Sequence, residues 1–346
     1  MLLRPRFGVL VFVFMLGIQV APCQQNISSN AATDRMIHLN IVVTDSSGHR
    51  VSGLTQQDFT LLDNKVVRQL TSFAETKENQ PPVQALIVLD AVNTPYTAVS
   101  YQRDQIEKYL RGNEGRLPIT TNFAVFTDKG IELHNPPSKD GIALSSDLEH
   151  KEIGLREIGR SGGVYGAEDR ETLSLNAFRA IVEYEAKLPG RKLVVWVSPG
   201  WPLLSGAGIN LDSTQEKQIF KNIVDFSTQL RESHVALYGI NSWGVTEALG
   251  QALYYEAFLK GVSKPDQAQL GDLGLQVLAT QSGGLVLNSS DVVGNLQKCM
   301  NDAGASYDVS FPAASTERHD EYHELSVRID KPGLTARTRK GYYSQP

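Results

Sequence analysis

The sequence predicts a mixed α/β fold: a doubly wound, mostly parallel sheet inserted between the N- and C-terminal strands of a β-sandwich. Two observations predict it. Through the middle of the chain, short and nearly continuous apolar segments alternate with amphipathic segments of helical period, as in a sheet that helices cover on both faces. Before and after that region, apolar and polar residues alternate with a period of two, which is typical of half-buried strands. With 346 residues, 41% of them hydrophobic, the chain can bury a large core.

The N-terminus has the pattern of a secretory signal peptide, predicted for residues 1–23. Arg4 and Arg6 precede an uncharged apolar segment that is shorter than a typical membrane span. We therefore expect an extracytoplasmic protein, whether periplasmic, secreted or on the outer surface, with no transmembrane span after cleavage. The residues up to Cys23 resemble a bacterial lipoprotein cleavage box. Two alternatives stand: a lipid anchor on Cys23, or simple cleavage.

Cysteine content and charge narrow the class of protein. Cys23 and Cys299 are the two cysteines of the chain, so disulfides do not form its scaffold. Cys299 falls on the apolar face of a predicted helix, and we expect a buried free thiol there. The formal net charge of -5 gives no basic surface of the kind that nucleic-acid binding requires, which excludes nucleic acid as a partner.

The domain organisation follows the changes in periodicity. After a polar spacer at residues 24–35, a small β unit is predicted for residues 36–74, where IHLNIVVTDSSG alternates and then turns. A second β rhythm occupies residues 305–346. Neither unit is large enough to close a core alone. We expect them to pair with each other, with an α/β domain at residues 83–304 inserted between them.

The α/β region reads as strands separated by helices. Ser213 and Glu216 suit a capping box at one helix start, and Pro189-Gly190 and Ser282-Gly283-Gly284 suit two helix ends. The predicted strands are, in order, QALIVLD, TNFAVFTD, GIELHNPP, KLVVWVS, HVALYGIN and GLVLNSS.

Several motifs together carry a family resemblance: VVTDSSGHRVSGLTQQDFTLLDN, LDAVNTP, YGAEDRETLSL, PGRKLVVWVSPG, YYEAFLKGV and KPGLTARTRKGYY. As a set they resemble the von Willebrand factor type A fold, which is Rossmann-like, and more closely a subfamily of exported bacterial proteins, well represented in acidobacteria, called VWFA-related. The resemblance covers the chain from Met36 to Gln345. It implies a type A domain that binds a ligand at the carboxyl end of its sheet.

Type A domains usually hold a divalent cation at that end, in a metal-ion-dependent adhesion site. The family pattern is Asp-x-Ser-x-Ser after the first strand, a Thr from a later loop and an Asp after the fourth strand. Hydroxyl and carboxylate oxygens suit Mg²⁺, a hard cation that prefers near-octahedral oxygen ligands.

Laid on this sequence, the family pattern is incomplete. Asp90 matches the first Asp and Thr94 replaces the second Ser, whereas Val92 stands where the first Ser belongs. Thr172 is the candidate for the loop Thr, and Ser198 stands in the place of the second Asp. We expect a degenerate site of Asp90, Thr94, Thr172 and Ser198 that binds Mg²⁺ or another divalent cation weakly or not at all, and no other cofactor. The alternative is that Asp90 only orders its turn through backbone N–H groups.

Two other residue patterns resemble catalytic or metal-binding motifs, and each also has a simpler structural interpretation. GRSGG fits a hydrolase nucleophile elbow at Ser161, but the residues before it do not form the buried strand that this motif requires. His319 and His323 have the spacing of a helical metal pair but fall in a turn and strand region. We expect a solvated loop for both histidines.

Two further clusters point to surfaces. Glu168, Asp169 and Glu171, with an arginine among them, are expected to form a charged loop with local ion pairs. Tyr254, Tyr255 and Phe258 are either a patch that faces a partner or the packing surface of an insertion on its own domain. Both alternatives stay open at this point.

The leading functional hypothesis is an exported, non-enzymatic binding or adhesion-type module with a protein or extracellular ligand. The strand ends and loops of such a sheet converge on one edge, and no complete catalytic set accompanies them. Fold alone does not fix function. The alternatives are a structural component of the cell envelope anchored through Cys23, and a hydrolase that uses Ser161 or Asp90.

Overall fold

The computed structural model describes most of the chain from Met36 onward, which forms one compact unit, Met36–Pro346. The predicted signal peptide, the spacer, Cys23 and Ser161 lie outside the described residues. The described residues are 36–76, 83–134, 136–151, 153, 163–202, 204, 210–242, 253–304, 306–314 and 319–344, with side chains from 166 onward in the helix that begins at 163.

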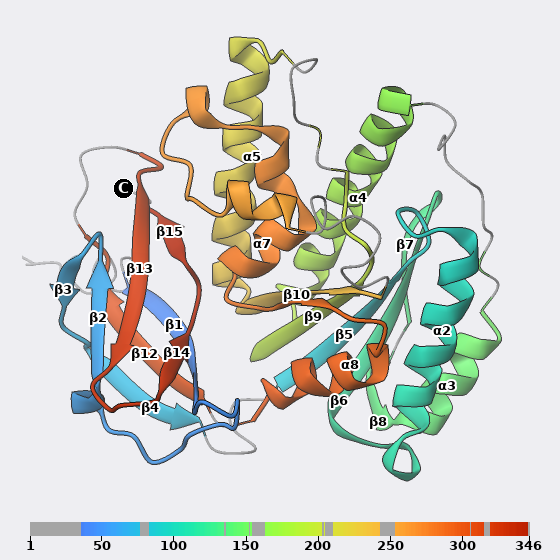
Figure 1. The fold of residues 1–346 in the computed structure, drawn as a ribbon, viewed down its shortest axis with the longest axis horizontal. Helices are drawn as coiled ribbons and strands as arrows, with labels where there is room; N and C mark the ends of the chain where they lie inside the picture. The colour runs from blue at the N-terminus through green and yellow to red at the C-terminus, as the bar shows by residue number, and fades with distance from the viewer. Residues whose placement is uncertain are drawn as a thin grey trace, which may run out of the picture. The chain divides into compact units, whose positions relative to one another are not determined.

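A seven-stranded sheet forms the centre of the α/β region (Figure 1). Its path runs β11-β10-β9-β5-β6-β7, and β8 pairs with β6. All pairs are parallel except those of β7 and β8 with β6. The chain adds β6 and β7 on one side of β5, then returns to the other side of β5 and adds β9, β10 and β11. This is the doubly wound order. The bounds are β5 Val83–Asp90, β6 Arg116–Thr127, β7 Gly130–Leu133, β8 Ser138–Asp140, β9 Arg191–Val197, β10 Val235–Asn241 and β11 Val286–Asn288.

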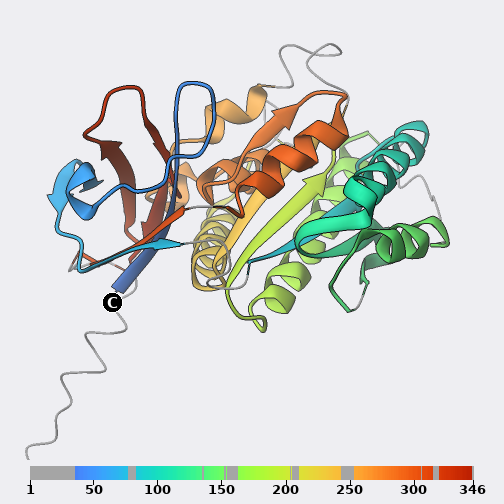
Figure 2. The ribbon, with the colours of Figure 1, turned by 90° about the horizontal axis from the view of Figure 1, so that it is seen from below.

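Helices cover both faces of this sheet (Figures 1 and 2). Alternate residues of β5 explain why: Leu86 and Val88 belong to one buried cluster, and Ile87 and Leu89 to the other. The prediction of a mostly parallel sheet flanked by helices is confirmed, and this architecture is compatible with the type A fold. One face carries α2 Tyr96–Arg111, α3 Gly141–Glu149 and α8 Val292–Asn301, and the other carries α4 Gly163–Glu185, α5 Ser213–Glu232 and α7 Leu275–Gln281.

Helix ends follow local sequence signals, with one shift. The capping box of α5 is formed by Asp212 and Gln215, one residue before the predicted pair Ser213 and Glu216. Gly283, with φ of 88°, follows the end of α7 as expected. Short 3₁₀ helices occupy Gln56–Asp58, Asn113–Gly115, Tyr254–Phe258 (η4), Pro265–Gln267 and Leu270–Leu273.

Cys299 lies on α8, where its side chain is fully buried, and it is a free cysteine. The prediction of a buried thiol on an apolar helix face is therefore confirmed. Among the described residues, none of the helices combines the length and apolarity needed to cross a bilayer.

The remaining strands form two four-stranded antiparallel sheets, with paths β14-β1-β12-β4 and β15-β13-β2-β3. N-terminal strands pair with C-terminal ones: β1 with β12, and β2 with β13. Inward-facing side chains from both sheets share one hydrophobic cluster. The bounds are β1 Met36–Thr44, β2 Phe59–Asp63, β3 Val66–Arg68, β4 Ser72–Thr76, β12 Ser306–Pro312, β13 Tyr322–Ile329, β14 Thr335–Arg337 and β15 Gly341–Tyr343.

One carboxylate joins the antiparallel sheets to the α/β region. Asp302, which caps the end of α8, accepts a hydrogen bond from Arg50 at 2.9 Å and one from the Tyr238 hydroxyl at 2.7 Å. It also pairs with Arg337 of β14, and its backbone carbonyl accepts from Arg191 at 2.7 Å. Groups from three distant parts of the sequence thus converge on one side chain.

The prediction of a solvated loop for the two histidines is wrong for His323. His319 is exposed in a turn, but His323 is buried in β13, where its Nδ1 lies 2.7 Å from Oδ1 of Asp63. Its ring stacks on Tyr342 at 4.8 Å. The β2–β13 pairing brings the histidine and the aspartate together, so this polar pair belongs to the core of the antiparallel sheets.

Candidate functional site

The carboxyl ends of β5, β9 and β10 lie side by side and form what we call the carboxyl edge of the parallel sheet. The register places Leu89 of β5 beside Val197 of β9, and Val197 beside Ile240 of β10. The next residues, Asp90 and Ser198, are therefore neighbours. Ligand sites of open α/β sheets generally lie at such an edge.

Asp90 is fully buried and accepts hydrogen bonds on both carboxylate oxygens. Oδ1 accepts from the backbone N–H groups of Val92 at 2.9 Å and Asn93 at 2.8 Å. Oδ2 accepts from the Asn93 side-chain amide at 2.9 Å and from the Trp196 indole N–H at 2.9 Å. Four N–H groups of the protein itself thus surround the carboxylate.

Burial and hydrogen bonding act in opposite directions on this group. Burial raises the pKa of Asp90, whereas the hydrogen bonds from Asn93, Trp196 and Ser198 partly offset that effect. Because all of these partners donate, their arrangement stabilises the carboxylate form in particular.

Two of the other three predicted ligands are buried, Ser198 at the end of the neighbouring strand and Thr94 in the loop that follows Asp90. Ser198 is buried, and its hydroxyl hydrogen-bonds to Asp90. Thr94 is also buried, and its Oγ1 has no hydrogen-bond partner in the described part of the chain. Thr172 differs: it lies on α4 with its side chain exposed. The α4 hydroxyl that reaches the Asp90 loop belongs to Ser174, which accepts from the Asn93 amide at 2.9 Å.

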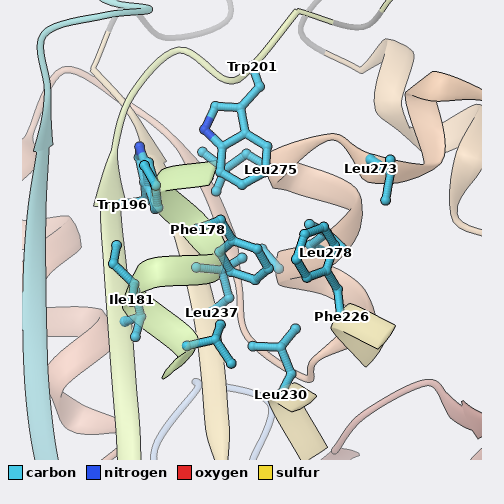
Figure 3. Packing of buried hydrophobic residues seen from close by; sticks show 14 of the residues in the cluster. Phe178, Ile181, Trp196, Trp201, Phe226, Leu230, Leu237, Leu273, Leu275 and Leu278 are labelled. Carbon is cyan, nitrogen blue, oxygen red and sulfur yellow. The ribbon is translucent and has the colours of Figure 1, made fainter. Parts of the chain in front are cut away.

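The indole of Trp196 is a member of the site that sequence reasoning missed. Trp196 belongs to a buried strand and packs against Trp201 at 5.1 Å between ring centroids. Figure 3 shows the two rings close together above Phe178. An aromatic residue inside an apolar strand is normally predicted to be a core residue. The parallel pairing of β5 and β9 is needed to show that the indole N–H points at Asp90.

The prediction of a charged loop at Glu168, Asp169 and Glu171 is wrong. Glu168, Asp169 and Glu171 all lie within α4, and Glu171 is only 7% exposed. Glu171 and Ser174 are three residues apart, so they share the buried face of the helix beside the Asp90 loop. The helical spacing from Phe178 and Ile181 back to Ser174 and Glu171 could have indicated this.

The Glu171 carboxyl has an unusual protonation equilibrium. Burial, followed by the charge of Glu168, raises its pKa from the ordinary value of 4.5 to about 7. One of its oxygens, Oε1, is buried and has no hydrogen-bond partner in the described part of the chain. This carboxyl is therefore largely protonated in the folded protein below neutral pH.

Replacing Glu171 by glutamine is expected to weaken the fall in stability with rising pH. Between pH 4.5 and about 7 the unfolded chain has released the Glu171 proton while the folded chain retains it, so the free energy of unfolding falls as pH rises. Glu171 contributes about 2–3 kcal/mol to that fall, and Glu171→Gln removes this contribution. Denaturant titrations across this range measure the slope.

The control for this experiment is Glu183→Gln, on the exposed face of the same helix. Glu185 and Asp272 also have pKa values raised by burial, to about 7 and about 6, so part of the slope remains in every variant. An unchanged slope in Glu171→Gln would mean that Glu171 is ionised in the folded protein.

The other sequence candidates are resolved in part. Phe258 of η4 is buried against Gly271, whereas Tyr254 remains 41% exposed, so this segment packs on its own domain with one face and presents the other. Within the described residues, no three His, Cys, Asp or Glu side chains come together as a metal-binding group.

Comparisons with known proteins add likenesses of fold. No protein-family model matches the chain, and no curated protein matches it by sequence. Human COPII-coat protein Sec24c is similar over 76% of this chain and 43% of its own, with 11% identity and a TM-score of 0.31. Manganese-loaded Plasmodium vivax TRAP protein is similar over 79% of this chain and 98% of its own, with 8% identity and a TM-score of 0.35. The open form of the pilus adhesin SpaC from Lactobacillus rhamnosus GG is similar over 83% of this chain and 48% of its own, with 9% identity and a TM-score of 0.39.

The chain spans less than half of the Sec24c and SpaC chains, at 43% and 48% of their lengths. Similarity at these identities and TM-scores carries no conclusion about activity or partners. The function has to be argued from the residues of this chain.

Proposed function

We propose that this protein is an exported, non-enzymatic binding module of the type A class that recognises a protein ligand at the carboxyl edge without a resident divalent cation. The observation that carries the proposal is the Asp90 carboxylate, whose two oxygens accept four N–H groups of the protein. These donors supply the positive electrostatic environment that a cation supplies in a metal-ion-dependent adhesion site.

The residues around Asp90 do not fit a hexacoordinate cation. A Mg²⁺ ion requires about six oxygen ligands at close to ideal octahedral geometry. Val92 offers no oxygen side chain and is buried in the apolar cluster, and Thr172 is exposed. Binding a cation at Asp90 would displace the Trp196 or Asn93 donors and leave their N–H groups unsatisfied, which costs about 1–3 kcal/mol each.

An exposed tyrosine beside this edge supports a protein-binding role. Tyr96 is the first residue of α2, follows the Asp90 loop directly and is 56% exposed. Tyrosine contributes a large amphipathic contact area and is enriched among the residues that dominate interface energies. Tyr101, five residues further along α2, is also exposed, and its hydroxyl donates to the Ser290 carbonyl at 2.7 Å.

The remaining parts of the proposal concern location and organisation. The pattern of residues 1–23 supports export, with Cys23 either lipidated or simply near the cleavage point. The two antiparallel sheets, with their shared core, support a β-sandwich that carries the α/β domain at residues 83–304. Mass spectrometry of the mature N-terminus distinguishes a lipid-anchored envelope protein from a released one.

Tyr96→Ser is expected to reduce adhesion of the purified protein at least about tenfold, as expected for the loss of an aromatic anchor. Retention is measured on surfaces coated with collagen, fibrinogen or fibronectin, with Mg²⁺ and with EDTA. We expect the chelator to change retention little, because the proposed site uses no cation. The matched control is Ile142→Ser, since Ile142 is 57% exposed at the start of α3, beside Gly115 at the amino end of β6.

Two results would contradict the proposal. Loss of adhesion in EDTA, together with micromolar Mg²⁺ binding in calorimetry that Asp90→Ala abolishes, would identify a working metal site. Equal loss in Tyr96→Ser and Ile142→Ser would place the binding surface away from the carboxyl edge.

A further inference from the structure

A cavity lies at the opposite, amino end of the parallel strands. Its volume is about 390 Å³, within the range of about 300–1,000 Å³ that is usual for small-molecule sites. Val83 at the start of β5, Arg191 at the start of β9 and Val235 at the start of β10 form one side. The outward face of the sheet that contains β1, β12 and β4 forms the other. We call it the Arg339 cavity.

The antiparallel sheet gives this cavity its polar wall. Because β1 places alternate side chains in the core, the residues between them, such as Asn40 and Val42, face the cavity. The lining includes one carboxylate, Asp308, and neutral donors already occupy it: Asn40 donates to Oδ1 at 2.8 Å and Thr76 to Oδ2 at 2.5 Å. Both Asp308 oxygens are therefore already hydrogen-bonded within the protein, and no ion pair of Asp308 with a cavity arginine occurs among the described residues.

Four arginines line the cavity, and three of them have partners. Arg191 donates to the Asp302 carbonyl, and Arg337 pairs with the Asp302 carboxylate. Arg231 pairs with Glu232 at 3.0 Å, although its Nε is buried without a hydrogen-bond partner in the described part of the chain.

Arg339 is the exception. It lies between β14 and β15, is only 8% exposed, and lines the cavity. Within the described residues its guanidinium makes neither a salt bridge nor a hydrogen bond to a side chain or carbonyl. The strongest charged neighbour is Arg231, which has the same sign, while Tyr322 acts weakly in the opposite direction. Burial followed by the Arg231 repulsion lowers the pKa of Arg339 to about 9.

Such an arrangement is unfavourable unless something compensates it. A buried charge without a counter-ion is strongly destabilising in a protein whose net stability is small. A guanidinium binds carboxylates with two parallel hydrogen bonds, and a buried, perturbed cation facing a cavity is a frequent mark of a ligand site. The missing partner is therefore an anion that enters from outside.

We propose that the Arg339 cavity binds a small organic monocarboxylate, with its carboxylate on Arg339 and its apolar part between Val42, Val83 and Val235. A monoanion is the simplest ligand that supplies the missing partner, because Arg339 is the cavity arginine with neither a salt bridge nor a side-chain hydrogen bond in the described part of the chain. His234 adds little charge, since burial and then Lys192 lower its pKa below the ordinary 6.5. Two buried groups without partners in the described residues, the Arg231 Nε and the Asn40 Oδ1, remain for further polar atoms of the ligand.

The test uses hexanoate as the probe and hexanol, hexanamide and inorganic phosphate as comparisons. Calorimetry and thermal unfolding are measured on the full chain. We expect hexanoate to bind and to raise Tm, the two neutral analogues to have no effect, and Arg339→Met to weaken hexanoate binding at least about tenfold. The control Arg116→Met removes an exposed arginine and should leave binding unchanged.

A second variant keeps the test decisive if Arg339→Met does not fold. Ala74 lines the cavity from an exposed position on β4, so Ala74→Trp should obstruct the entrance while leaving Arg339 in place, and it should also abolish hexanoate binding. No stabilisation by hexanoate, equal affinity in the wild type and both variants, or tighter binding of phosphate than of hexanoate would each overturn the proposal.

Discussion

Asp302→Ala is expected to lower the free energy of unfolding by about 3 kcal/mol, because it removes the counter-charge of two partly buried arginines at once. Arg50 and Arg337 both pair with this carboxylate, and the Tyr238 hydroxyl also donates to it. Alanine removes the carboxylate to which two guanidinium groups and a phenol donate. Urea titrations followed by tryptophan fluorescence measure the change, since Trp196 and Trp201 lie in the α/β core.

The comparison for Asp302 is a surface ion pair. Asp225 pairs with Lys221 along α5, and both side chains are substantially exposed, so Asp225→Ala should change stability by less than about 1 kcal/mol. Similar small effects in Asp302→Ala and Asp225→Ala would show that the arginines find other partners or water, and that Asp302 does not hold the sheets to the α/β region.

Asp90→Ala is expected to lower the free energy of unfolding by about 2–4 kcal/mol, with or without Mg²⁺. The variant leaves the Trp196 indole and two backbone N–H groups buried without acceptors, and each unsatisfied donor costs about 1–3 kcal/mol, although the losses do not add fully. Asp90→Asn should also destabilise the protein, because its amide group would turn a donor toward other donors.

Asp104→Ala, which removes an exposed carboxylate from α2, is the matched control and should change stability by no more than about 0.5 kcal/mol. One result would contradict this interpretation. If Mg²⁺ stabilises the wild-type protein but not the Asp90→Ala variant, then Asp90 binds a cation instead of the Trp196 and Asn93 donors.

Periodicity predicts the parallel sheet well because burial on both faces forces its strands to be apolar throughout. The segments QALIVLD and KLVVWVS became β5 and β9, with every residue from Ala85 to Asp90 buried. The start of α4 was harder to predict. Its second and third turns contain Glu168, Asp169 and Glu171, whose charges favour a loop, and the burial of Glu171 depends on tertiary packing that overrides local preference.

The polar contacts of the core could not be predicted from sequence for a related reason. The pairing of His323 with Asp63 joins residues 260 positions apart, and the Trp196 hydrogen bond to Asp90 spans 106 positions. Each depends on which strands become neighbours and in what register. A motif such as Asp-x-Ser-x-Ser reports oxygen ligands near one another in sequence, but not donors arriving from an adjacent strand.

The pairing of β1 with β12 has a consequence for the order of folding. Met36 lies opposite Pro312, so the first strand cannot find its partner until almost the whole chain is available. Chains that end before Ser306 leave β1 and β2 with unpaired edges, which are prone to aggregate, while the α/β segment between them can already form its own local contacts. We expect closure of the antiparallel sheets to be the late and slow step of folding, and the C-terminal strands β12 and β13 to determine when β1 and β2 become ordered.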